Sequence, residues 1–128
     1  MNNTEKVIQE IKEFHNDIEA WFRGKGDQES LYKKLLAGFN ADFKMVNGNS
    51  DTITFTDFSE WLPGAYGQFQ DRNIVLENIE VHTTENHGLA FYIEIQTTGN
   101  TVTRRKSSAV FMIGEERAFW LHLIEKWI

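Results

Sequence analysis

The chain has 128 residues, a formal net charge of −6 at pH 7 and no cysteine. This length suits one domain spanning 1–128, and the missing cysteines exclude a disulfide frame and a thiolate metal site. The acidic balance argues against a nucleic-acid partner, and the lack of a signal peptide or an apolar run of ~20 residues argues against a membrane, so we expect a cytoplasmic protein.

Two amphipathic helices are predicted at the start of the chain. Between 7 and 22, apolar residues recur at steps of three and four, which places them on one face of a helix. Asn2 or Asn3 can cap the start of this helix. A second, shorter helix follows Asp27, turns its leucines inward and ends at Gly38.

A hairpin and a third helix are predicted next. The segments 39–46 and 52–55 have the composition of strands, and the polar segment 47–51 between them forms a tight turn. The segment 56–62 is predicted to be a short helix that is capped by Asp57.

Four long strands are predicted to complete the chain. The turns between them are short, so consecutive strands pair as an antiparallel meander. The predicted ranges are 73–84, 89–98, 101–113 and 118–128.

Alternation within the meander separates two faces of the sheet. On the second long strand, Tyr92 and Glu94 share one face and Phe91 shares the other with its apolar neighbours. On the third, Arg105 and Ser107 share a face. Apolar residues occur on both sides, so we expect one face to pack on the helices and the other on a partner.

The order of these elements resembles the nuclear-transport-factor-2-like superfamily. Three segments are similar to a mostly uncharacterised bacterial branch related to the SnoaL-like cyclases and the kinase-II association domain: DIEAWFRG at 17–24, TRRKSSAVF at 103–111 and WLHLIEKW at 120–127. The resemblance implies an α+β fold in which two to three N-terminal helices back a cone-shaped, strongly bent, mostly antiparallel sheet. It says little about function, because the superfamily includes isomerases, cyclases, hubs and non-catalytic binders.

Two activities found in the superfamily lack their key residues here. The aspartate base of ketosteroid isomerases corresponds to Asn47, which cannot accept a proton in this role, and the first helix has no tyrosine to act as their donor. The two arginines that line the cone of the kinase association domain correspond to Glu94 and Ala109. The resemblance therefore does not support an anionic ligand held in that way.

The leading candidates for a ligand site are Glu94, Arg105 and Tyr92. Strand parity puts them on the side of the sheet that the resemblance assigns to the interior of the cone. Glu94 and Arg105 could orient a polar ligand or form a structural ion pair, and Tyr92 could donate to the ligand or pack in the core.

Further candidates surround this group. His122 on the last strand could act as acid or base, but a register shift of one residue would turn it outward and bring Glu125 in. Trp61 and Tyr66 are expected near the mouth of the cone. His15, at the margin of the first-helix stripe, is either a wedge between helix and sheet or a residue that approaches the cone.

The sequence favours a small-molecule-binding cone domain. The candidate chemistry is proton transfer of the isomerase, cyclase or dehydratase type, with Glu94 or His122 as acid or base. The alternative is a non-catalytic homodimeric module with a binding or structural role, so the question of catalysis is left open. No cofactor is expected, and no metal site, because His82 and His87 lack metal-ligand spacing.

A homodimer through the outer face of the sheet is also expected. The apolar residues predicted on that face leave a patch of the kind that usually marks an interface. They are Val110, Met112, Leu121, Leu123 and Trp127.

Overall fold

The computed structural model describes residues 1–128, which form three helices and one six-stranded sheet. In chain order the elements are α1 (Asn3–Arg23), α2 (Gln28–Ala37), β1 (Phe39–Val46), β2 (Thr52–Thr54), α3 (Phe55–Ala65), β3 (Asn73–Thr83), β4 (His87–Thr98), β5 (Thr101–Ile113) and β6 (Ala118–Trp127).

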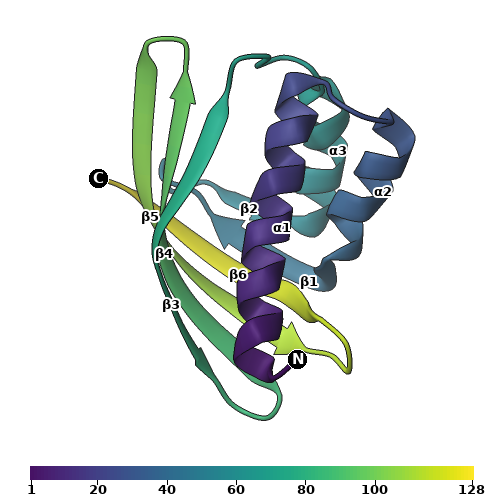
Figure 1. Ribbon diagram of the computed structural model, residues 1–128, viewed down its shortest axis with the longest axis vertical. Coiled ribbons are helices and arrows are strands. Elements are labelled where there is room, and N and C mark those ends of the chain that lie inside the picture. Colours follow the sequence, from purple (N-terminus) through teal and green to yellow (C-terminus); the bar gives the residue numbers. More distant parts are fainter.

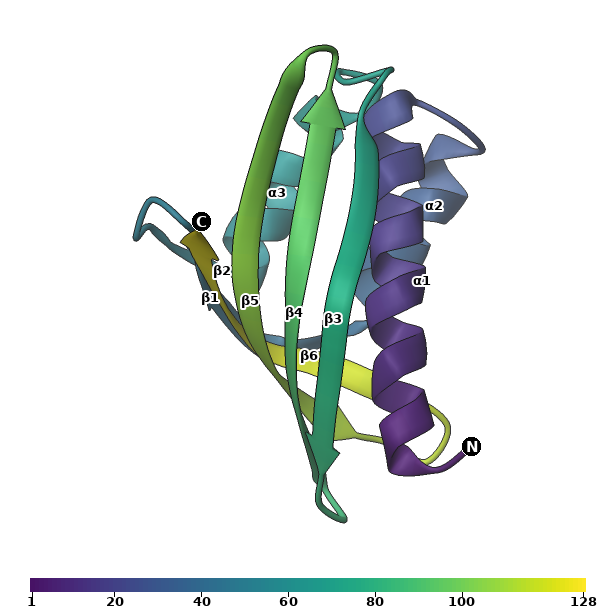
Figure 2. The ribbon, with the colours of Figure 1, turned by 60° about the vertical axis from the view of Figure 1, so that its left-hand side comes forward.

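The sheet is strongly bent, and its helices lie on one side. The strand order is β2-β1-β6-β5-β4-β3, and every neighbouring pair is antiparallel except β1 with β6. Figure 1 shows α1 crossing the concave side with α2 and α3 beyond it, and Figure 2 shows that no helix covers the opposite face. The predicted fold class, an α+β arrangement with a bent, mostly antiparallel sheet backed by helices, is confirmed.

Helix α1 has complete signals at both ends. The Asn2 side chain accepts from the backbone N–H of Glu5, and the Glu5 carboxylate accepts from the backbone of Asn2. At the other end Gly24 adopts φ 72°, a left-handed conformation in which its N–H donates to the last helical carbonyls. None of the three helices combines the length and apolar character needed to cross a bilayer.

Helix α3 differs from its prediction at both ends. Its N-cap is Thr54 rather than Asp57, so the preceding strand is one residue shorter than expected, and Asp57 instead completes a capping box with Thr54. The helix also continues through Pro63 to Ala65. Proline cannot donate to the carbonyl of Ser59, and the hydroxyl of Tyr32 on α2 donates to that carbonyl over 2.9 Å.

A β-bulge in β6 decides which residues face the helices. Trp120 pairs with Phe111 and His122 pairs with Val110, so Leu121 is an extra residue on β6. Side-chain alternation therefore reverses at Leu121. The residues after Leu121 lie on the opposite face of the sheet from the one expected for a strand without a bulge.

The apolar core has two parts, and both contact α1. One part lies between α1 and the sheet, and the other lies among the three helices. Phe14 packs against both. Residues of both parts line a cavity.

Candidate functional site

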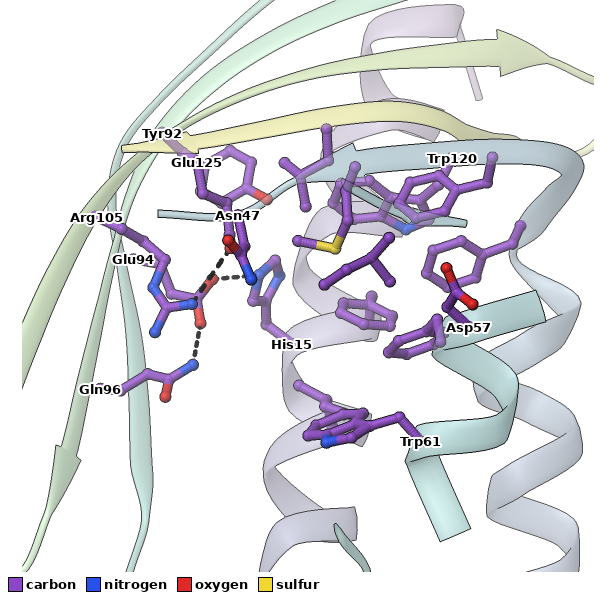
Figure 3. A pocket seen from close by; sticks show the side chains of 18 of the residues that line it. His15, Asn47, Asp57, Trp61, Tyr92, Glu94, Gln96, Arg105, Trp120 and Glu125 are labelled. Atoms are coloured by element: carbon purple, nitrogen blue, oxygen red, sulfur yellow. Dashed lines mark hydrogen bonds and ion pairs between the residues drawn. The ribbon is translucent and has the colours of Figure 1, made fainter. Parts of the chain in front are cut away.

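A cavity of about 480 Å³ lies between the concave face of the sheet and helices α1 and α3. Twelve of its 19 lining residues are hydrophobic. Figure 3 shows the polar ones together at one end, apart from Asp57, which lies on the opposite side of the cavity. Trp61 on α3 lines the cavity while about half of its surface (53%) stays exposed, which places it at the rim. The apolar wall includes Phe14, Phe39, Phe43, Phe58, Met45 and Leu123.

Glu94 on β4 is the most firmly held carboxylate in the cavity. It is 5% exposed, and its two oxygens contact His15 Nε2 at 3.2 Å and Gln96 Nε2 at 2.6 Å. Burial alone would raise the pKa of Glu94, but the hydrogen bond and charge of His15, with help from Arg105 and Gln96, hold that pKa at about 2. The group is therefore an ionised carboxylate with both oxygens engaged.

His15 on α1 is the partner of Glu94. Its Nδ1 lies 2.7 Å from the carbonyl oxygen of Ile11, which can only accept, so Nδ1 carries a hydrogen. Its Nε2 faces an ionised carboxylate, which also only accepts. Both contacts are satisfied when the ring carries two hydrogens, so the geometry assigns a buried imidazolium–carboxylate pair between α1 and β4.

Arg105 lies directly opposite Glu94 in the register of β4 and β5 but pairs with Glu125 on β6. The contacts are long, 3.4 and 3.5 Å from Nη1 to the two carboxylate oxygens. The guanidinium also stacks on Trp127, 4.7 Å from the ring centre. Burial raises the pKa of the Glu125 carboxyl, against the lowering effect of Arg105.

Several buried polar atoms beside this pair have no hydrogen-bond partner. They include the hydroxyls of Tyr92 and Ser107 and the Nε of Arg105. Tyr92 and Ser107 face each other across β4 and β5 and are only 3% and 2% exposed. Burial, and then the charges of Glu94 and Glu125, raise the pKa of Tyr92 well above its usual value, so its hydroxyl stays protonated. The Ser107 hydroxyl is close enough to oppose this rise but does not meet hydrogen-bond geometry, so the Tyr92 hydroxyl is a donor without an acceptor.

Comparison with known proteins identifies the architecture. No family model and no curated protein matches the sequence. Among solved structures, an NTF-2-like protein of unknown function from Pseudomonas aeruginosa is 24% identical with a TM-score of 0.91, and the match covers 96% of this chain and 98% of that one. The CaMKII hub of S. rosetta has a TM-score of 0.79 at 6% identity, and the match covers 100% of this chain and 98% of the hub.

The chain has the nuclear-transport-factor-2-like fold. The resemblance seen in the sequence is thus confirmed at the level of the fold. An NTF2-like protein from Cytophaga hutchinsonii has a TM-score of 0.75 at 8% identity over the whole of both chains. At these identities the likeness concerns the fold, and the chemistry has to be judged from the side chains of this chain.

Within this nuclear-transport-factor-2-like fold, four of the six predicted ligand-site residues line the cavity. They are Tyr92, Glu94, Arg105 and Trp61.

The other two predicted site residues lie elsewhere. His122 is outside the cavity because the bulge at Leu121 turns it to the outer face, and Glu125 takes the inward position, as in the alternative register. Tyr66 is not at the mouth. It packs edge-on against Trp21, with ring centres 4.8 Å apart, and its hydroxyl donates to the carbonyl of Gly26.

The same bulge corrects the expected outer face. Leu123 lines the cavity, and Trp127 stacks on Arg105 and donates from its indole to Asn49, so neither is on the outer face. The residue that sequence reasoning undervalued is His15. Its signal was a histidine four residues after Ile11, at the margin of the apolar stripe of α1.

Proposed function

We propose that the protein binds a small, mostly apolar molecule in the cavity, with the polar part of that molecule at the end formed by Tyr92, Arg105 and Glu125. The supporting observation is the cavity itself: about 480 Å³, largely aromatic walls and polar side chains converging at one end. Ligand sites typically have volumes of roughly 300–1,000 Å³ and combine an apolar lining with a few placed polar groups.

The polar end also has the groups needed for proton transfer of the isomerase, cyclase or dehydratase type. Glu94 is a poor base, because its pKa is low and both of its oxygens are engaged. Glu125 is the better candidate acid or base: burial raises its pKa, and its only hydrogen bonds are the long ones from Arg105. Arg105 and Tyr92 would then stabilise negative charge that develops on an oxygen.

Binding is tested with a neutral aromatic probe, 2-naphthamide, titrated by isothermal calorimetry. We expect saturable one-site binding to the wild-type protein. Ile53→Trp, which adds bulk inside the cavity, should abolish this binding, whereas Val102→Trp, at a position that is 59% exposed and outside the cavity, should not change it. Unchanged binding to Ile53→Trp, or a wild type that binds neither this amide nor its charged analogues with the same naphthalene body, would overturn the proposal.

We also propose that two copies associate through the outer face of the sheet. On that face Leu89, Phe91 and Ile124 are all more than a third exposed. The strand register brings these residues close together. Leu89 pairs with Val110 on β5, and Phe91 pairs with Ser108, which in turn pairs with Ile124 on β6. An apolar patch of this kind usually marks an interface.

Charges at the two sides of this patch support a second copy as the partner. Glu77 and Glu80 lie on β3, whereas Lys106 and Lys126 lie on β5 and β6. A two-fold axis parallel to the strands would bring the acidic side of one sheet over the basic side of the other. The face is therefore complementary to itself.

A further inference from the structure

The buried charges at the polar end fall into one tight pair and one loose pair. Glu94 and His15 balance each other, and both carboxylate oxygens are used. Arg105 has only Glu125, at distances well beyond the ~2.7–2.9 Å of a strong hydrogen bond from a guanidinium to a carboxylate. The guanidinium is therefore the buried charge that lacks a close counter-ion.

Donors without a partner lie on that guanidinium and beside it. The Nε of Arg105 and the hydroxyls of Tyr92 and Ser107 have no partner. Their strands place them together, because Tyr92 is opposite Ser107 and Glu94 is opposite Arg105 on the same face of β4 and β5. A buried donor without an acceptor is unfavourable, so an acceptor oxygen bound at this point would receive hydrogen bonds from more than one of these groups.

From this arrangement we propose that the polar end recognises the carboxylate of an otherwise apolar ligand, with Arg105 as the cationic contact and the hydroxyl of Tyr92 as a further donor. The inference rests on the proposed binding function and specifies its ligand class. An ammonium group would meet the positive charges of Arg105 and His15, and its one loosely held counter-ion would be Glu125, whose burial favours the neutral acid. A neutral amide would satisfy the hydroxyl donor but would leave the guanidinium without a counter-ion.

Carboxylate binding should be coupled to protonation of Glu125. The charged or titratable groups that face Glu125 are His15 from α1, Tyr92 and Glu94 from β4, and Arg105 from β5. A second carboxylate next to Arg105 would repel an ionised Glu125, and burial already favours its neutral form. The ligand therefore replaces Glu125 as the counter-ion of Arg105, and Glu125 takes up a proton.

The charge preference is tested with three probes that share one apolar body: 2-naphthoate, 2-naphthamide and 2-naphthylmethylamine. Dissociation constants are measured by calorimetry at pH 6 and pH 8 with the full chain. We expect 2-naphthoate to bind at least ~10-fold more tightly than the amide at pH 6, since a hydrogen bond between a guanidinium and a carboxylate is stronger than one to a neutral amide. The amine should bind most weakly, and the advantage of 2-naphthoate should shrink at pH 8.

Variants separate the roles of the three side chains. Arg105→Met should remove the preference, so that the folded variant binds 2-naphthoate no more tightly than the amide. Tyr92→Phe should weaken 2-naphthoate without harming the fold, because the lost hydroxyl has no partner. Glu125→Gln, which is already neutral, should bind 2-naphthoate more tightly than the wild type at pH 8.

The outcomes distinguish the two proposals. Saturable binding of the amide that equals or exceeds that of 2-naphthoate in the wild type would overturn the carboxylate assignment alone. The same follows if Tyr92→Phe and a folded Arg105→Met both keep the wild-type preference. Failure of all three probes to bind would overturn the proposed function and this inference with it.

Discussion

Glu94 and Arg105 face each other across β4 and β5, yet each is paired with a different residue. Strand parity predicted that the two residues lie close together on the concave face. Two roles were left open for them: a structural ion pair or contacts to a ligand. They form neither a direct ion pair nor two free ligand contacts. Glu94 is fixed by His15 and Gln96, and Arg105 is left with a distant Glu125. Glu94 therefore belongs to a tightly held charge pair, whereas the guanidinium of Arg105 has only long contacts to its carboxylate partner.

The pair of His15 and Glu94 should stabilise the fold. His15→Leu leaves a buried carboxylate without its cation, and we expect a loss of about 3 kcal/mol in the free energy of unfolding measured with urea. Glu94→Gln should cost less, because an amide can donate to an imidazole that has lost its second hydrogen. The double variant should lose less than the sum of the single losses. Strictly additive losses would argue against a direct interaction.

Glu94 should also make stability depend on pH in the acid range. Its folded-state pKa of about 2 is lower than the ordinary 4.5, so the unfolded chain binds the proton first. The stabilisation is fully present above pH 4.5 and is lost as the pH falls towards 2. The difference corresponds to about 3 kcal/mol. Unfolding curves between pH 5 and pH 2 should show a shallower decline for Glu94→Gln, whereas Glu29→Gln, at an exposed site, should follow the wild type.

Glu125 should have the opposite pH dependence. Its folded-state pKa is raised, so its contribution is most favourable below pH 4.5 and is lost as the pH rises through the folded-state pKa. Glu125→Gln should therefore be at least as stable as the wild type at pH 8, and its advantage should vanish near pH 4. Melting temperatures of both proteins at the two pH values check this. A variant less stable at pH 8 would mean that Glu125 stabilises the fold as a charged partner of Arg105.

The fold could be predicted from the sequence because the patterns that define it involve residues close together along the chain. The apolar stripe of α1 and the short turns define the helices and the meander, and the predicted segments 39–46 and 101–113 coincide with β1 and β5. Alternation along β4 and β5 is regular, so it placed Tyr92, Glu94 and Arg105 correctly. In a strand without a bulge, side chains alternate strictly between the two faces, so the sequence alone shows which residues share a face.

The site was only partly accessible, for two physical reasons. The bulge at Leu121 has no glycine or other local signal, and both faces of β6 are apolar, so the sequence did not show where alternation reverses. That single residue exchanged His122 for Glu125 in the cavity. The partner of Glu94 was hidden for another reason: His15 is 79 residues away along the chain, and only the packing of α1 on the sheet brings the two together.

The outer face of the sheet gives the last prediction, a homodimer with twice the chain mass of 14.9 kDa. Phe91 is 38% exposed and Ile124 is 48% exposed, and both pair with Ser108, which lies between them in the sheet. A glutamate at either position would bury charge without a partner in the interface. Light scattering at micromolar concentration should give the dimer mass for the wild type and the single-chain mass for Phe91→Glu and Ile124→Glu. Val102→Glu, at the tip of the β4–β5 hairpin, is the matched control and should remain dimeric. A wild-type mass of one chain would contradict the prediction.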